Sequence, residues 1–207
     1  MKLVVGPVPG SRTFDPQEPG WEPLREPTPD RFLAYALLLS VPILAPGLLL
    51  LPRLVEAARF APALLFEFVA ALTAIIVIHE VVHALCYPGG LWSPRVCLGL
   101  WPSRLTFYAS YEGPMSRNRF LLVLATPAVV LTAMLLPPMI WAAPTWRAFA
   151  TALCLIHLSA CTGDFLGIWL LVRQVPRNAQ VQNDGWKTYW QPLHQVPIAF
   201  SGTGSRI

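Results

Sequence analysis

The stretch from Phe60 to Tyr87 decides the fold, and it reads FAPALLFEFVAALTAIIVIHEVVHALCY. It is apolar over most of its length and carries a group of ionisable side chains at residues 79–83. About 20 apolar residues are enough to span the hydrocarbon core of a bilayer as a helix. The sequence Pro88-Gly89-Gly90 follows directly and is typical of a helix end. The stretch therefore predicts a membrane helix with ionisable groups close to its C-terminal end.

The composition of the whole chain also indicates a membrane protein. Of its 207 residues, 55% are apolar and 13% are charged, whereas a soluble domain usually has about 25% charged residues. The mean hydropathy is +0.51. This composition excludes a disordered chain, a coiled coil and a collagen-like repeat. The net charge of +4 arises from Lys and Arg scattered between apolar segments, so no nucleic-acid partner is expected.

Four apolar segments are long enough to cross the membrane. The predicted helices cover residues 32–51, 60–87, 120–142 and 148–172. Lys and Arg are concentrated before the first helix, between the second and the third, and after the fourth. Because cytoplasmic loops retain Lys and Arg, both chain termini are expected in the cytoplasm. The predicted location is the cytoplasmic membrane, as a multi-pass integral protein.

The segments outside these helices differ in character. Residues 1–31 are rich in proline and lack the apolar core of a signal peptide, which predicts an irregular cytoplasmic arm. Residues 173–207 predict a cytoplasmic C-terminal tail. Between the second and third helices, apolar residues alternate on either side of Trp101-Pro102-Ser103, which indicates a β-hairpin over residues 91–111. An irregular interfacial loop anchored by aromatic side chains is the alternative for this segment.

Together these segments predict an all-α membrane protein. Its domain, residues 32–172, would contain four transmembrane helices with a short interfacial or re-entrant β-hairpin between helices two and three. Strand edges exposed to lipid leave backbone groups without hydrogen-bond partners, so a re-entrant hairpin would have to be shielded by protein.

The ionisable group in the second helix has the HExxH pattern, His79-Glu80-Val81-Val82-His83. Residues four apart lie on the same helix face, so both imidazoles can bind one zinc ion. Glu80 is next to the first histidine and can take the proton of a zinc-activated water molecule. An ionisable side chain in a membrane helix usually has a function, because its insertion costs about 2.5–3.5 kcal/mol. The alternative is a polar cluster that joins helices through hydrogen bonds.

A catalytic zinc site normally has three protein ligands, so the pattern requires one more. The candidates elsewhere in the chain are Glu67, Glu112, His157, Cys161, Asp164, Asp184 and His194. In a straight fourth helix, Asp164 would lie about 13 Å from the helix end, level with His79 in the second helix. His157 would lie about 10 Å further along the same axis. This comparison of depths favours Asp164 as the third ligand.

Four side chains of the predicted fourth helix share one face. Cys154, His157, Cys161 and Asp164 follow the spacing i, i+3, i+7 and i+10. This face is expected to look toward the second helix, where His157 and Cys161 would either support the metal ligands or pack against a neighbouring helix. Both also remain alternatives for the third ligand.

Three short motifs occur in the same order as in a known protein family. They are His79-Glu80-Val81-Val82-His83-Ala84-Leu85, the segment 116–120 leading into Ala125-Thr126-Pro127, and Cys161-Thr162-Gly163-Asp164. With the hairpin, this order resembles the site-2 protease family of intramembrane zinc metallopeptidases, and is most similar to a bacterial group of zincin-type membrane peptidases. The resemblance implies one zinc ion with His79, His83 and Asp164 as its ligands and Glu80 as the general base. The sequence differs from site-2 proteases in one motif: those proteins usually have the aspartate before the glycine, whereas here Gly163 precedes Asp164.

The sequence therefore predicts an intramembrane zinc metallopeptidase that hydrolyses a peptide bond in or near the bacterial cytoplasmic membrane. Its expected partners are a peptide or membrane-protein substrate and the lipid bilayer. Water must reach the metal, so a polar cavity is expected between the second and fourth helices, covered by the hairpin. The competing hypothesis is a non-catalytic membrane metal-binding or scaffold protein that retains a zincin-like site. Such a protein would not need a general base at Glu80.

Overall fold

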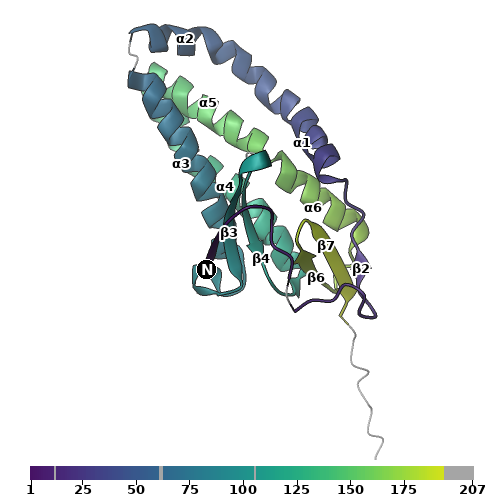
Figure 1. The fold of residues 1–207 in the computed structure, drawn as a ribbon. Coiled ribbons are helices and arrows are strands. Elements are labelled where there is room, and N and C mark those ends of the chain that lie inside the picture. Colours follow the sequence, from purple (N-terminus) through teal and green to yellow (C-terminus); the bar gives the residue numbers. More distant parts are fainter. Residues whose placement is uncertain (12, 61–62, 105, 194–207) are drawn as a thin grey trace, which may run out of the picture.

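The computed structural model describes residues 1–11, 13–60, 63–104 and 106–193. The helices form an elongated bundle, and the strands gather toward one end of it (Figure 1). The helices are α1 (Pro29–Leu44), α2 (Leu51–Phe60), α3 (Ala63–Cys86), α4 (Arg117–Trp141), α5 (Pro144–Ala160) and α6 (Thr162–Gln174). The strands are β1 (Lys2–Val5), β2 (Glu22–Pro23), β3 (Val96–Trp101), β4 (Thr106–Tyr111), β5 (Met115–Ser116), β6 (Ala179–Asp184) and β7 (Lys187–Pro192).

The prediction of an all-α protein is wrong, because the strands form two sheets and the fold is mixed α/β. In the first sheet, of order β1-β3-β4, the strands β3 and β4 pair antiparallel within the segment expected to form a hairpin. Strand β1 pairs with β3 in parallel and covers its other edge. The second sheet has the order β2-β7-β6-β5.

Both terminal segments contribute strands that their composition did not suggest. Strand β1 comes from the proline-rich arm, and β6 and β7 come from the segment expected to be a tail. A strand edge without a partner leaves its N–H and C=O groups free, so the short segments β1 and β2 pair with β3 and β7 even though they are weak strands alone. One signal was present in the sequence: Gly185 stands at the first position of the two-residue turn Gly185-Trp186, which favours a glycine, and it adopts a φ of 58° there.

Within the described residues, three helical segments are long and apolar enough to cross a membrane: Pro29–Glu56, Ala63–Cys86 and Arg117–Trp141. The pair α5 and α6 makes a fourth if it is counted as one span, but it is bent by 41°. The straight helix expected over residues 148–172 is therefore broken at Cys161, between α5 and α6. This bend decides the geometry of the functional site.

The outer surface of these helices is strongly apolar. Large side chains that are more than half exposed include Leu38 on α1, Phe66 on α3, Val129 on α4 and Trp169 on α6. A soluble protein rarely exposes so much contiguous apolar surface, whereas lipid chains cover it without penalty. The length and surface of the helices indicate that the protein associates with a membrane.

Helix α3 is held between two buried apolar clusters. Toward its N-terminal side, Ile75 packs with Leu131 of α4 and Leu153 of α5. Toward its C-terminal end, Ala84 belongs to a larger cluster that also includes Val123 of α4. The segment 79–83, which carries the two histidines, lies between these two clusters, so its position is fixed by packing on both sides.

Glu26 attaches the N-terminal arm to the second sheet. The backbone N–H of Thr188 in β7 donates to one carboxylate oxygen of Glu26 at 2.9 Å, and the Thr188 hydroxyl donates to the other at 2.7 Å. Burial nevertheless raises the pKa of Glu26 to about 7, because it outweighs the opposing effects of Thr188 and of Lys187. The attachment of the arm is therefore sensitive to pH.

We expect the stability of the folded protein to fall as the pH rises from about 4.5 to about 7. The folded state keeps the Glu26 proton to a higher pH than the unfolded chain, so stability is full below the unfolded pKa and decreases through the folded one. The decrease is at most about 3 kcal/mol, at 1.36 kcal/mol per pKa unit. Glu26→Gln should lack this component, as measured by unfolding in detergent at pH 5 and pH 8. Equal pH dependence in both proteins would contradict the assignment.

Candidate metal centre

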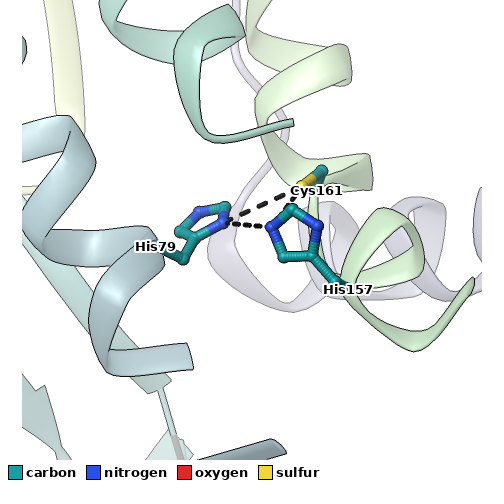
Figure 2. Close-up of side chains that lie close together, drawn as sticks. All are labelled: His79, His157 and Cys161. Atoms are coloured by element: carbon teal, nitrogen blue, oxygen red, sulfur yellow. Dashed lines mark hydrogen bonds between the residues drawn. The ribbon is translucent and has the colours of Figure 1, made fainter. Parts of the chain in front are cut away.

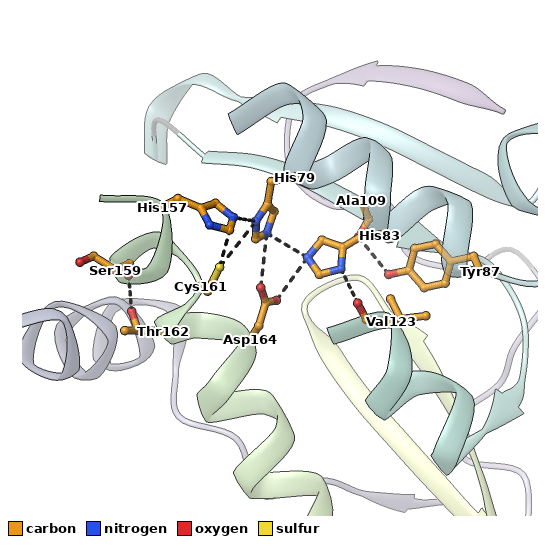
Figure 3. Close-up of polar contacts among 10 residues, drawn as sticks. All are labelled: His79, His83, Tyr87, Ala109, Val123, His157, Ser159, Cys161, Thr162 and Asp164. Carbon is orange, nitrogen blue, oxygen red and sulfur yellow. Dashed lines mark hydrogen bonds and ion pairs between the residues drawn. The ribbon is translucent and has the colours of Figure 1, made fainter. Parts of the chain in front are cut away.

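The two histidines of the HExxH pattern converge on one side of α3. Their Nε2 atoms lie 3.0 Å apart, as expected for residues one turn apart on the same face. Both side chains are buried, with 9% of His79 and 6% of His83 exposed. Figure 3 shows the two rings directed toward the same point, opposite the carboxylate of Asp164.

Asp164 comes from the first turn of α6 and completes the group. Its Oδ2 lies 3.3 Å from Nε2 of His79, and its Oδ1 lies 3.4 Å from Nε2 of His83. The break before α6 is stabilised by Thr162, whose hydroxyl lies 2.7 Å from the Ser159 carbonyl and 3.0 Å from the Ala36 carbonyl of α1. The broken helix thus turns Asp164 toward α3 and ties the bend to α1.

Gly163 allows α1 to approach this bend closely. A Cβ atom at this position would lie 3.3 Å from the ring of Phe32. That distance is shorter than ordinary van der Waals contact, so a larger residue would push the ring of Phe32 or the start of α6 away. The glycine that precedes Asp164 in the sequence therefore serves the packing of the bend against α1.

The second histidine is oriented by a backbone carbonyl that a proline leaves free. His83 Nδ1 lies 2.9 Å from the carbonyl oxygen of Val123 in α4. In a regular helix this carbonyl would accept from the N–H four residues later, but that residue is Pro127, which has none. When His83 Nδ1–H donates to Val123, the lone pair of Nε2 points toward His79 and Asp164.

The segment 116–120 fastens the start of α4 to the end of α3. The Ser116 hydroxyl caps α4 by accepting from the backbone N–H of Arg119 at 3.3 Å. The side chain of Arg119 in turn donates through Nε to the carbonyl of Cys86, the last residue of α3. This contact fixes the C-terminal end of the helix that carries both histidines.

The three side chains fit a zinc ion. Tetrahedral ligands at zinc distances of about 2.0–2.1 Å lie about 3.3 Å from one another, close to the 3.0, 3.3 and 3.4 Å separations in this group. Oδ2 of Asp164 is buried and has no hydrogen-bond partner among the residues that the structure describes. A buried carboxylate oxygen without a partner is unfavourable, and a bound cation would satisfy it.

Glu80 faces the same cavity as the two histidines. The cavity has a volume of about 280 Å³ and is lined from α3 by His79, Glu80, His83 and Tyr87. Strand β4 contributes Phe107 to Ser110, and the backbone of Ala109 lies next to Glu80. Further walls come from α6 and from the turn between β6 and β7. The carboxylate therefore has access to the space in front of the histidines.

The cavity is also lined by residues outside the predicted metal site. Glu26 and Phe32 come from the arm and α1, and Trp186 and Thr188 come from the β6–β7 hairpin. Glycine at the β6–β7 turn and alternating apolar residues around it were the available signal for Trp186 and Thr188. No sequence signal pointed to Glu26, because its role depends on pairing between distant strands.

His157 and Cys161 lie on the other side of His79. The predicted separation of His157 from the site along a straight helix is wrong: its Nε2 atom lies 3.2 Å from Nδ1 of His79. α5 and α6 are bent by 41° at Cys161, and His157 reaches His79 from the last turn of α5. His79, His157 and Cys161 form a second group of side chains with metal-ligating atoms.

The remaining candidates for the third ligand lie elsewhere. Glu67 is exposed on α3. Glu112 pairs with Lys2 at 3.0 Å, and Asp184 accepts from the backbone N–H of Ser11 at 2.9 Å. His194 lies outside the described residues. The structure thus brings Asp164 to His79 and His83 and places these other carboxylates apart from them.

An HExxH helix and an acidic residue from a second helix are the elements of a zincin-like metal centre. The chain belongs to the protein family described as "Putative zincin peptidase", whose sequence profile matches residues 72–180, more than half of the chain. The matched segment contains His79, Glu80, His83 and Asp164. Neither the curated proteins nor the solved structures contain a match. Membership of this family supports a metallopeptidase and implies zinc as its metal.

Proposed function

We propose that the protein is an intramembrane zinc metallopeptidase related to the site-2 proteases. The observation that carries this proposal is the convergence of His79, His83 and Asp164 beside Glu80 in one cavity, on helices apolar enough to lie in a membrane. The substrate would be a peptide segment within or next to the bilayer. The distribution of Lys and Arg supports an orientation with both termini in the cytoplasm.

In this proposal His79, His83 and Asp164 hold the metal. Zinc, when bound, supplies Lewis acidity that acidifies water and polarises the scissile carbonyl. The Glu80 carboxylate accepts the proton of the attacking water molecule and donates it to the amine that leaves. Its place beside His79 and the Ala109 backbone keeps it in the cavity during both transfers.

The cavity walls support a peptide substrate rather than a small charged one. Apolar and aromatic side chains of Phe32, Phe107, Tyr108 and Leu171 surround the polar residues. They exclude bulk water from the reacting bond and offer apolar contacts to side chains of a membrane segment. The non-catalytic alternative is less well supported, since Glu80 would then be a half-buried acid in the cavity without a role.

We expect cleavage of membrane peptides to depend on a removable metal. The purified full-length protein would be reconstituted in vesicles with a mixture of synthetic transmembrane peptides, and new peptide termini would be identified by mass spectrometry. 1,10-Phenanthroline should abolish cleavage and added zinc should restore it, whereas the non-chelating 1,7-isomer should have no effect. Cleavage that persists after metal removal would contradict the proposal. A zinc-loaded protein that produces no new termini would favour the non-catalytic alternative.

A further inference from the structure

On the side that faces away from Asp164, His79 contacts another buried histidine, His157. His157, in the last turn of α5, places Nε2 3.2 Å from Nδ1 of His79, and only 2% of its surface is exposed. Figure 2 shows the two rings directed toward each other with the Cys161 thiol beside them. Cys161 Sγ lies 3.4 Å from Nε2 of His157 and 3.8 Å from Nδ1 of His79.

We infer that His157 is a positioning residue for the metal site: it accepts the Nδ1–H hydrogen bond of His79 and thereby directs His79 Nε2 toward His83 and Asp164. This inference rests on the proposed function, since it assigns Nε2 of His79 to the metal. It goes beyond that function by giving a role to a residue outside the HExxH pattern.

The positions of the protons support this role. A neutral imidazole that offers the Nε2 lone pair to a metal carries its proton on Nδ1, and this buried donor needs an acceptor. The nearest acceptor is Nε2 of His157; the Cys161 sulfur is further away and accepts weakly. His157 then carries its own proton on Nδ1, a buried atom with no partner in the described part of the chain. Nε2 is thus the atom of His157 that accepts the hydrogen bond from His79 Nδ1–H.

The two metal-site histidines are therefore held by different acceptors. His83 donates to a backbone carbonyl that Pro127 leaves free, whereas His79 donates to a side chain. A carboxylate in this position would add negative charge to a buried site. The uncharged imidazole of His157 orients His79 without changing the charge around the metal.

The bend between α5 and α6 supplies both the third ligand and the positioning residue. His157 and Asp164 are seven residues apart, which is about 10 Å along a straight helix. The helix is bent by 41° at Cys161, and His157 and Asp164 contact opposite nitrogen atoms of the same imidazole from the two sides of the bend. The two sides of the α5–α6 junction therefore contact His79 from both sides, His157 at Nδ1 and Asp164 at Nε2.

His79, His157 and Cys161 could also hold an ion of their own, since their ligating atoms lie within 4.8 Å of one another. Such an ion would need the lone pair of His79 Nδ1 while Nε2 serves the first site. His79 would then have to lose both protons and bridge two metals. The hydrogen bond requires no such ionisation, which is why the positioning role is the better explanation.

The test uses two variants at residue 157 in the full-length protein in detergent. His157→Leu fills the space without an acceptor and leaves little room for water, and His157→Gln keeps an acceptor oxygen. Cys154→Ala is a control at an equally buried position one turn earlier in α5. Zinc affinity is measured by competition with a chelator, and the visible spectrum of the cobalt(II) protein reports the ligand geometry.

We expect His157→Leu to weaken zinc binding about 10–100-fold and to alter the cobalt spectrum. His157→Gln should recover most of the affinity, and Cys154→Ala should retain the wild-type affinity and spectrum even if it lowers the unfolding temperature. Wild-type zinc affinity and spectrum in His157→Leu would overturn the inference. So would a second metal equivalent in the wild type that is lost in this variant. A wild-type protein that binds no zinc would instead contradict the proposed function.

Discussion

Glu80→Gln is expected to reduce peptide cleavage by about 10²–10⁴-fold while zinc stays bound. Glutamine has the size and shape of glutamate, but its amide cannot accept the proton of the attacking water molecule. Glu80 is not among the three side chains that would hold the metal, so zinc content should not change. Initial rates of cleavage in vesicles and zinc content by mass spectrometry measure the two effects separately.

Helix α3 provides a matched control for this substitution. Glu67 is on the same helix, is exposed, and does not line the cavity. Glu67→Gln removes the same charge from α3 and should leave both cleavage and zinc content unchanged. Wild-type turnover in Glu80→Gln would mean that another group is the general base, even if zinc is essential.

Asp164→Asn is expected to weaken zinc binding by more than about 100-fold. Substitution of residues that only support a ligand typically costs 10–100-fold in affinity, so loss of a direct ligand should cost more. The carboxylate both binds the ion and neutralises part of its charge in a buried setting, and a neutral amide does neither well. Competition with a chelator of known affinity measures the change.

Asp184→Asn serves as the control for the loss of a carboxylate. Asp184 ends β6 and accepts from the backbone of Ser11, and it does not line the cavity. This variant should bind zinc as the wild type does. If Asp164→Asn retained wild-type affinity, the third ligand would have to be another residue, with His157 and Cys161 as the neighbours of His79.

The parts of the site that depend on local spacing could be predicted from the sequence. The histidines at residues 79 and 83 share a face of α3 because of helical periodicity, and no distant segment can change that. The lengths of α3 and α4 could also be predicted, because they depend on local runs of apolar residues. Both helices begin and end within three residues of the predicted ranges 60–87 and 120–142.

The bend at Cys161 could not be predicted from the same rules. The segment Cys161-Thr162-Gly163 contains no proline, and glycine alone is common in membrane helices. The break is stabilised by contacts with α1, through the Thr162 hydroxyl and the close approach of Phe32 to Gly163. Because these contacts are tertiary, a straight helix was the natural prediction, and it misplaced His157.

Apart from the hairpin of β3 and β4, the strands of the two sheets could not be predicted, for a related reason. Strand β1 pairs with β3 almost half of the chain away, and β2 pairs with β7 across most of the length of the chain. Segments as short as β2 and β5 have no periodicity to detect and become strands only through their partners. The cavity walls that depend on these pairings, including Glu26, were missed with them.

The central claim is that His79, His83 and Asp164 form a zinc site, and the zinc content of the purified protein tests it most directly. Full-length protein would be purified in detergent with zinc supplied and then desalted, and zinc per chain would be measured by inductively coupled plasma mass spectrometry. We predict one zinc per chain in the wild type and none in the double variant His79→Ala/His83→Ala. A wild-type protein without zinc, or a double variant that retains one zinc per chain, would contradict the claim.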